Sequence, residues 1–81
     1  MRITVRLFAA HREAAGAGTY VTELPDGSTV ADAFARVCSE YPAIARGSRS
    51  VAFALNQAHV SGDVPIEDGD ELALLPPVAG G

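Results

Sequence analysis

Residues 30–41 read VADAFARVCSEY, and this stretch decides the fold. Its apolar side chains recur at i, i+3, i+4, i+7, i+8 and i+11: Val30, Ala33, Phe34, Val37, Cys38 and Tyr41. This spacing predicts an α-helix with a single apolar stripe. Ser28 or Thr29 can cap its start, and Asp32 lies near the positive end of the helix dipole. Pro42 disfavours helical geometry at the preceding residue, so it should end the helix at Tyr41.

A helix with one apolar stripe needs one apolar partner surface, and the flanking segments predict a sheet. Residues 2–8 alternate, so that one side of the strand carries Ile3, Val5 and Leu7. Further strands are predicted over residues 19–24, 51–55, 58–60 and 71–75, the last with Leu72 and Leu74 facing the core.

The connecting segments are short. Residues 9–15 are expected to form one or two helical turns, residues 43–50 a polar loop, and residues 64–66 one helical turn. Asn56-Gln57 is typical of a tight turn. The order predicts an α+β fold in which one mixed sheet is covered on one face by one main helix. We expect the first and last strands to lie side by side in parallel, joined through a right-handed crossover.

Composition excludes several function classes. A length of 81 residues fits one domain, and a net charge of −4 argues against a nucleic-acid partner or an anionic membrane. No apolar run approaches the roughly 18 residues of a membrane span, so we expect a soluble cytoplasmic protein. One cysteine excludes an internal disulfide. The chain has no lysine, so its only amine is the amino terminus.

The last six residues are Pro76-Pro77-Val78-Ala79-Gly80-Gly81. Proline cannot donate to a sheet ladder, so Pro76 and Pro77 should end the fold. Glycine has no Cβ, so a Gly-Gly end can pass through a narrow slot. We predict a domain over residues 1–76 and a flexible tail over 77–81, with the Gly81 carboxylate as the reactive group. The alternative is a frayed end or a cloning scar.

A terminal carboxylate is a poor electrophile until ATP-dependent adenylation gives it a good leaving group. A sulfur donor can then displace AMP and leave a thiocarboxylate, a strong nucleophile that carries sulfur. In this hypothesis the partners supply the catalytic side chains.

The uncovered face of the sheet is a candidate docking surface. If the first and last strands are neighbours, Phe8 and Leu75 project from this face, near Arg2 and Arg6 and at the root of the tail. The alternative is that scattered apolar side chains on an open sheet are normal.

Other polar residues have structural explanations. His59, Ser61 and Asp63 alternate like a catalytic triad, but a Ser-Gly-Asp turn explains them. Cys38 belongs to the apolar stripe, so we interpret it as a packed core thiol.

The acidic run at residues 67–71 lacks the spacing of a calcium loop, so we interpret it as a solvated turn and predict no metal site. His11 lies in a short segment that we expect to be exposed.

Several segments together resemble one protein family. They are Val5-Arg6-Leu7-Phe8-Ala9 followed by Arg12-Glu13, then Asn56-Gln57, then Asp68-Gly69-Asp70-Glu71, and the terminal hexapeptide. In this respect the chain resembles the small sulfur-carrier subunits of molybdopterin synthase, in the ubiquitin-like MoaD/ThiS superfamily. The resemblance covers the whole chain, and the hexapeptide is its most specific part. It implies the β-grasp fold.

The resemblance also implies a mechanism. An E1-like adenylating enzyme would activate Gly81 with ATP and Mg²⁺, and a sulfur donor protein would convert it to a thiocarboxylate; no cofactor would be bound permanently. The carrier would dock on the large synthase subunit and pass sulfur to cyclic pyranopterin monophosphate, building molybdopterin. The matching docking positions are Phe8, His59 and Leu75, of which His59 departs from the usual apolar residue.

Other functions stay open at this point. Similar carriers feed thiazole or cysteine synthesis, although the Pro-Pro-Val-Ala lead-in favours the molybdopterin branch. A second class is a ubiquitin-like modifier joined through Gly81 to lysines on target proteins. A third is an interaction module with an inert tail.

Overall fold

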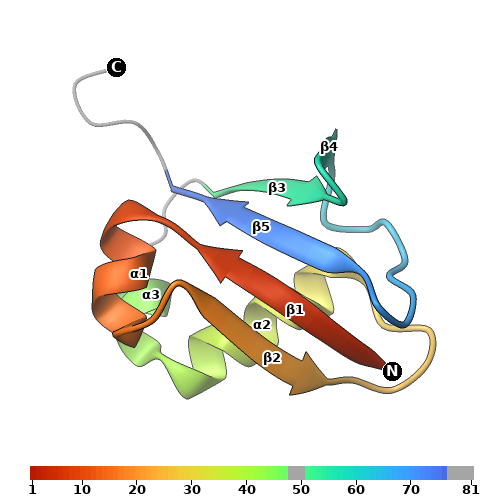
Figure 1. The fold of residues 1–81 in the computed structure, drawn as a ribbon, viewed down its shortest axis with the longest axis horizontal. Helices are drawn as coiled ribbons and strands as arrows, with labels where there is room; N and C mark the ends of the chain where they lie inside the picture. Colours follow the sequence, from red (N-terminus) through yellow and green to blue (C-terminus); the bar gives the residue numbers. More distant parts are fainter. Residues whose placement is uncertain (48–50, 77–81) are drawn as a thin grey trace.

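The computed structural model describes residues 1–47 and 51–76 (Figure 1). Its elements, in chain order, are β1 (Arg2–Leu7), α1 (Ala9–Ala15), β2 (Thr19–Glu23), α2 (Val30–Glu40), α3 (Pro42–Gly47), β3 (Ala52–Leu55), β4 (Ala58–Val60) and β5 (Glu71–Leu75). Within the described residues, one five-stranded sheet has the order β2-β1-β5-β3-β4. β1 and β5 are parallel and every other pair is antiparallel, so the predicted mixed sheet and the pairing of the first and last strands are confirmed.

The main helix, α2, begins and ends as its sequence predicts. Thr29 and Asp32 form a capping box: the Thr29 amide donates to Asp32 Oδ2 at 2.9 Å, and the Asp32 amide donates to Thr29 Oγ1 at 3.3 Å. The Ala31 amide donates to the carbonyl oxygen of Gly62 at 2.8 Å. These contacts satisfy amides that the first helical turn leaves without an intrahelical partner.

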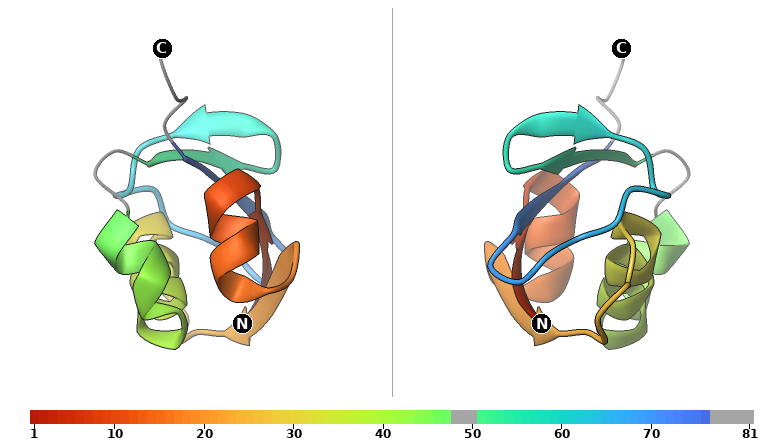
Figure 2. Two further views of the ribbon diagram at one scale, coloured as in Figure 1. Left: turned by 90° about the vertical axis from the view of Figure 1, so that its left-hand side faces the viewer. Right: turned by 90° about the vertical axis from the view of Figure 1, so that its right-hand side faces the viewer.

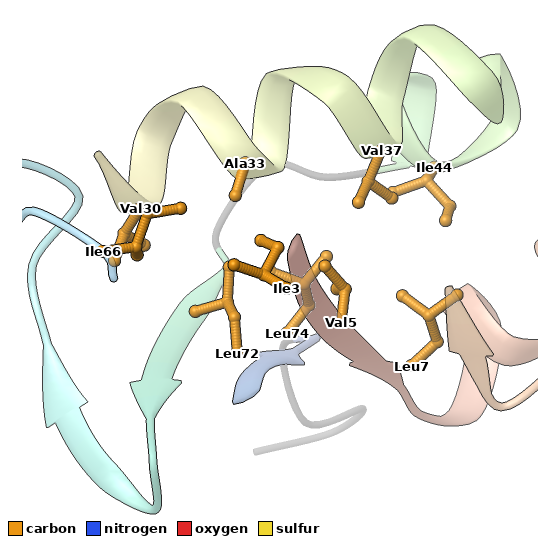
Figure 3. Close-up of a cluster of buried hydrophobic side chains, with 10 residues drawn as sticks. All are labelled: Ile3, Val5, Leu7, Val30, Ala33, Val37, Ile44, Ile66, Leu72 and Leu74. Atoms are coloured by element: carbon orange, nitrogen blue, oxygen red, sulfur yellow. The ribbon is translucent and has the colours of Figure 1, made fainter. Parts of the chain in front are cut away.

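The core lies between α2 and the concave face of the sheet (Figures 2 and 3). Aliphatic side chains from α2, β1 and β5 meet there, and α3 and the loop before β5 each contribute one more. The full set is Val30, Ala33, Val37, Ile3, Val5, Leu7, Leu72, Leu74, Ile44 and Ile66. Burying each of the larger ones stabilises the fold by roughly 1.5–3 kcal/mol before the entropy of ordering is counted. The rest of the helical stripe is half-buried, and Phe34 packs edge-to-face on Phe53.

The prediction of a polar loop over residues 43–50 is wrong where the structure describes it. Residues 42–47 form a short helix, α3, and Ile44 is buried beside Val37 (Figure 3). Proline suits the first position of a helix, so Pro42 ends α2 and also begins α3. Residues 48–50 lie outside the described part of the chain.

The predicted helical turn at residues 64–66 is also wrong. Pro65 forms an isolated bridge with Thr29, and the Ile66 amide donates to the Ser28 carbonyl oxygen at 3.0 Å. This pairing holds Ile66 in the core below the start of α2. The backbone partners that Ser28 and Thr29 offer outweigh the local helical preference.

His11 was expected to be exposed, and the structure buries it, with 4% of its surface accessible. It lies on α1, which contacts β1 and α3 and covers the end of the sheet where β1 and β5 terminate (Figure 1). Because α1 must turn one side toward the core, a polar residue in the middle of that helix becomes buried. In the described ranges, the structure contains no helix that is long and apolar enough to cross a membrane.

Candidate functional site: the outer face and the root of the tail

The candidate docking site lies on the sheet face away from α2, where β1 and β5 end. Leu7 and Leu74 are paired neighbours and both are buried, so the next residues, Phe8 and Leu75, fall on the opposite side. Arg6 is exposed on that side, and its guanidinium carbon lies 5.3 Å from the centre of the Phe8 ring. The structure therefore confirms that Phe8 and Leu75 share the uncovered face.

One row of residues crosses the sheet beside this pair. Arg6 is paired with Ala73, Ala73 with Ala54, and Ala54 with His59. Since paired residues point to the same side, this row lies on the side of Phe8 and Leu75. We call the whole set the outer face: Arg6, Phe8, Ala52, Ala54, His59, Ala73 and Leu75.

His59 is exposed on the edge strand β4, with the width of β3 and β5 between it and β1. The structure thus brings the three expected docking residues, Phe8, His59 and Leu75, onto one face. Ala73 and Ala54 lie between Arg6 and His59, so short side chains occupy the middle of this row and polar side chains its two ends.

Arg2 is not close to Phe8, contrary to the expectation. It pairs with Glu23 at the other end of β1, about 13 Å along the strand from Arg6. Its backbone amide donates to Asp68 Oδ1 at 2.7 Å. The expectation was wrong because residues four apart on a strand lie on the same side of the sheet but about 13 Å from each other. The charged neighbour of Arg6 is Glu71, with the nitrogen and oxygen 3.8 Å apart and both side chains nearly half exposed.

The root of the tail is fixed by its surroundings. β5 ends at Leu75, and Pro76 follows it, half-buried and outside the strand. Beneath this point lies His11, whose pKa is lowered by burial; a hydrogen bond with the Leu74 backbone raises it in part. The predicted tail residues Pro77, Val78, Ala79, Gly80 and Gly81 lie outside the described residues.

Ser61 and Asp63, two of the three residues that alternate like a triad, form a turn. The Ser61 hydroxyl donates to the Asp63 carboxylate within their turn, and this bond is the main reason that the pKa of Asp63 is lowered. Cys38 packs against the core, and burial raises the pKa of its thiol, which disfavours the reactive thiolate.

The acidic run before β5 is a turn held by its own carboxylates. Asp70 accepts from the Glu67 amide at 2.7 Å and from the Asn56 side-chain amide at 2.9 Å. Asn56 in turn accepts from the Glu71 amide at 2.9 Å. Among the residues that the structure describes, no three His, Cys, Asp or Glu side chains are grouped to hold a metal ion.

Sequence reasoning missed the part of Asn56 in this network. Asn56 and Gln57 both have positive φ, 49° and 73°, which confirms the tight turn between β3 and β4. The Asn56 side chain then joins that turn to the start of β5. The signal in the sequence was a side-chain amide, which can donate and accept at once, at a turn position. The acidic run begins eleven residues later, so its closeness to Asn56 comes from the fold.

Comparison with known proteins assigns the chain. A family model described as ThiS family matches residues 5–81. The chain belongs to the ThiS family. It is 39% identical over 83 residues to the molybdopterin synthase sulfur carrier subunit of Chlamydomonas reinhardtii, and the match covers 100% of both chains.

Two solved structures extend this ThiS-family likeness. SAMP1, the small archaeal modifier protein 1, from Haloferax volcanii has a TM-score of 0.89 and 29% identity, with 100% of both chains covered. A complex of subunits 1 and 2 of molybdopterin-converting factor from Helicobacter pylori gives a TM-score of 0.71 and 28% identity, again with 100% of both chains covered. The fold is therefore the ubiquitin-like β-grasp.

Proposed function

We propose that the chain is the sulfur carrier subunit of a molybdopterin synthase and that its Gly81 carboxyl group is the group that carries the sulfur. The observation that carries the proposal is the full-length match to a relative that bears this name, together with a family match that runs to residue 81. The Gly81 carboxylate attacks the α-phosphorus of ATP and releases pyrophosphate. A sulfur donor then displaces AMP, so a thiocarboxylate replaces the carboxylate.

In this scheme the folded domain is the part of the chain that partner proteins bind. No cofactor is bound permanently; an E1-like adenylating enzyme holds the ATP and Mg²⁺, and a sulfur donor protein supplies the sulfur. Because activation consumes ATP, we place the carrier in the cytoplasm. The large synthase subunit supplies the catalytic side chains, and cyclic pyranopterin monophosphate accepts the sulfur.

The outer face is the proposed docking surface for the large subunit. A domain contact is needed because ordering residues 77–81 in a partner's active site costs roughly 5–8 kcal/mol. Phe8 and Leu75 offer apolar area where the tail begins, and the aromatic ring is already oriented by Arg6. The Helicobacter pylori neighbour, a complex of subunits 1 and 2, supports a partner of this kind.

Intact-mass spectrometry tests the function. The chain is incubated with ATP, Mg²⁺, an activating enzyme and a sulfur source, and we expect one oxygen to be exchanged for sulfur at Gly81. Adding the large subunit and cyclic pyranopterin monophosphate should restore the original mass as molybdopterin forms. A thiocarboxylate that survives this addition but is consumed by a thiazole or cysteine precursor would assign the carrier to another pathway.

A modifier is the second candidate, since the likeness to small archaeal modifier protein 1 favours it. It predicts isopeptide bonds between Gly81 and lysines of other proteins in cell extracts. Digestion and mass spectrometry of a tagged chain would detect such Gly81-linked peptides, and their absence under conditions that produce the thiocarboxylate would reject this role.

A further inference from the structure

The 81 residues contain no lysine, and all six basic residues are arginines. The ε-amine of lysine becomes a nucleophile when it loses a proton, whereas the guanidinium of arginine stays protonated in proteins. No side chain of this protein therefore offers an amine to an activated acyl group. The absence matters here because the proposed function places an activated carbonyl on the chain itself.

The remaining amine, at Met1, is engaged in the fold. Its ammonium donates to the Leu24 carbonyl oxygen at 2.8 Å and lies 3.8 Å from Asp26 Oδ1. The Met1 side chain also packs against the core. To attack a carbonyl, the nitrogen must lose a proton, which removes the positive charge that attracts the Asp26 carboxylate.

Met1 is also remote from the root of the tail. It lies at the opposite end of the sheet from the end of β5 (Figure 1). Since Leu7 pairs with Leu74, Met1 is about 20 Å along β1 from that point. Residues 76–81 span at most about 20 Å when fully extended. Within one molecule, the terminal carbonyl reaches Met1 only if the tail lies flat along the whole sheet.

The other nucleophiles are weak or form no lasting product. Cys38 is half-buried with a raised pKa, so little of it is thiolate. His59 is exposed, but an acyl-imidazole is hydrolysed by water to the free acid.

We propose that the chain is built so that it does not acylate itself, and that its activated terminus survives to meet an external acceptor. The inference rests on the proposed function, because only an activated Gly81 makes self-acylation a hazard. In the excluded step, an amine nitrogen bonds to the Gly81 carbonyl carbon, the leaving group departs, and the ammonium proton passes to solvent. If the chain is a modifier, a copy joined to a target's side chain offers no lysine of its own to which a second copy could be joined.

The test uses a Gly81 thioester prepared chemically, without an activating enzyme, and incubated at mildly alkaline pH. It compares the wild type with Arg12→Lys and Arg2→Lys, both at exposed positions. Arg12 lies on α1 one turn beyond Phe8, because its amide donates to the Phe8 carbonyl oxygen at 3.3 Å. Arg2 lies at the far end of β1.

The wild type should convert to the free acid. Arg12→Lys should give a product one water lighter than the acid, with Gly81 joined to residue 12 in the digest. We expect roughly tenfold more of it than in the wild type, because a tethered acceptor acts at a high effective concentration. Arg2→Lys should give less than Arg12→Lys, since residue 2 is about 17 Å along β1 from the end of β5 and the tail must be well extended to span that distance.

Two results would overturn the inference. One is that the wild type joins Gly81 to the Met1 amine, giving the product one water lighter than the acid, as fast as Arg12→Lys forms its own such product. The other is an Arg12→Lys chain that only hydrolyses, with Arg6→Lys, at an exposed position paired with Ala73 of β5, as a second variant if the first fails to fold. Because no enzyme takes part, neither result depends on recognition by partners; failure of the proposed function appears in the oxygen-for-sulfur experiment instead.

Discussion

Phe8 and Leu75 are made neighbours by two strands from opposite ends of the chain. Neither is fully buried, and each follows a residue that is. Alternation along a strand is what turns them outward, and the parallel pairing of β1 and β5 is what brings them together. Arg6 then covers one side of the Phe8 ring, which limits the positions the ring can take.

Phe8→Asp or Leu75→Asp should weaken binding of the large subunit by about 2 kcal/mol, or roughly 30-fold in Kd, because each removes apolar contact area. Titration calorimetry measures the affinity, and thermal unfolding measures the stability. Val21→Asp is the matched control, since Val21 is 51% exposed on the edge strand β2 and is paired with Thr4, about 13 Å along β1 from Phe8. A collapse of stability in the Phe8 or Leu75 variant would place that residue in the core instead.

His11 gives the fold a pH dependence of predictable sign. Burial lowers its pKa in the folded chain below the ordinary value of 6.5. The unfolded chain therefore binds more protons in the window just below pH 6.5, and the free energy of unfolding falls as the pH falls through it. Urea unfolding between pH 5 and about pH 7.5 should show this loss. The lowered pKa of Asp63 lies below 3.8, outside the window.

His11→Leu should remove most of this slope. An unchanged slope in His11→Leu would show that another group titrates with folding.

At the scale of elements, α2 holds the sheet through its stripe and is anchored at its first turn. The capping box is local to that turn, and the Gly62 carbonyl, which accepts from the Ala31 amide, ties the turn to the loop before β5. A Cβ at Gly62 would lie 3.3 Å from the Ala31 Cβ, so the loop and helix are in close contact there. The helix start therefore couples α2 to the strand that carries the root of the tail.

Thr29→Ala should lower the free energy of unfolding by about 1 kcal/mol, because the Asp32 amide loses its acceptor. Chemical denaturation measures the change. Ser39→Ala, at an exposed position within α2, serves as the control and should change stability by less than about 0.5 kcal/mol. Equal effects in the two variants would mean that the cap contributes nothing.

Periodicity predicted the elements that pack on one another over a long stretch: α2, β1 and β5. It failed for α3, because six residues are too short to show a helical repeat, and for His11, because the docking of α1 decides which side of that short helix is buried. Alternation predicted the positions of Phe8 and Leu75. His59 came only from the resemblance, since its place on the outer face depends on strand order, which no local pattern encodes.

At the scale of the whole molecule, scaffold and tail are expected to be separable. The core draws on residues from Ile3 to Leu74, and β5 ends one residue later. Stability should therefore be a property of residues 1–76 and sulfur transfer a property of the end of the chain.

Removing Gly81 should abolish thiocarboxylate formation and molybdopterin synthesis while shifting Tm by no more than a degree or so, about what a change outside the core produces. Intact mass and scanning calorimetry report the two properties. Replacing Ala79 by Ser, which keeps the terminal carboxylate, is the control for altering the tail. Loss of folding on removal of Gly81 would contradict the division.

The pairing of β1 with β5 also sets the kinetics of folding. It joins segments as far apart as Arg2 and Asp68, which are 66 positions apart in sequence. Closing so long a loop is slow, and it must precede the sheet because β5 lies between β1 and β3. Until this closure, Phe8 and Leu75 are not neighbours. A half-formed carrier would thus lack the neighbouring Phe8 and Leu75 of the proposed docking surface, so the large subunit would bind only chains in which this loop has closed.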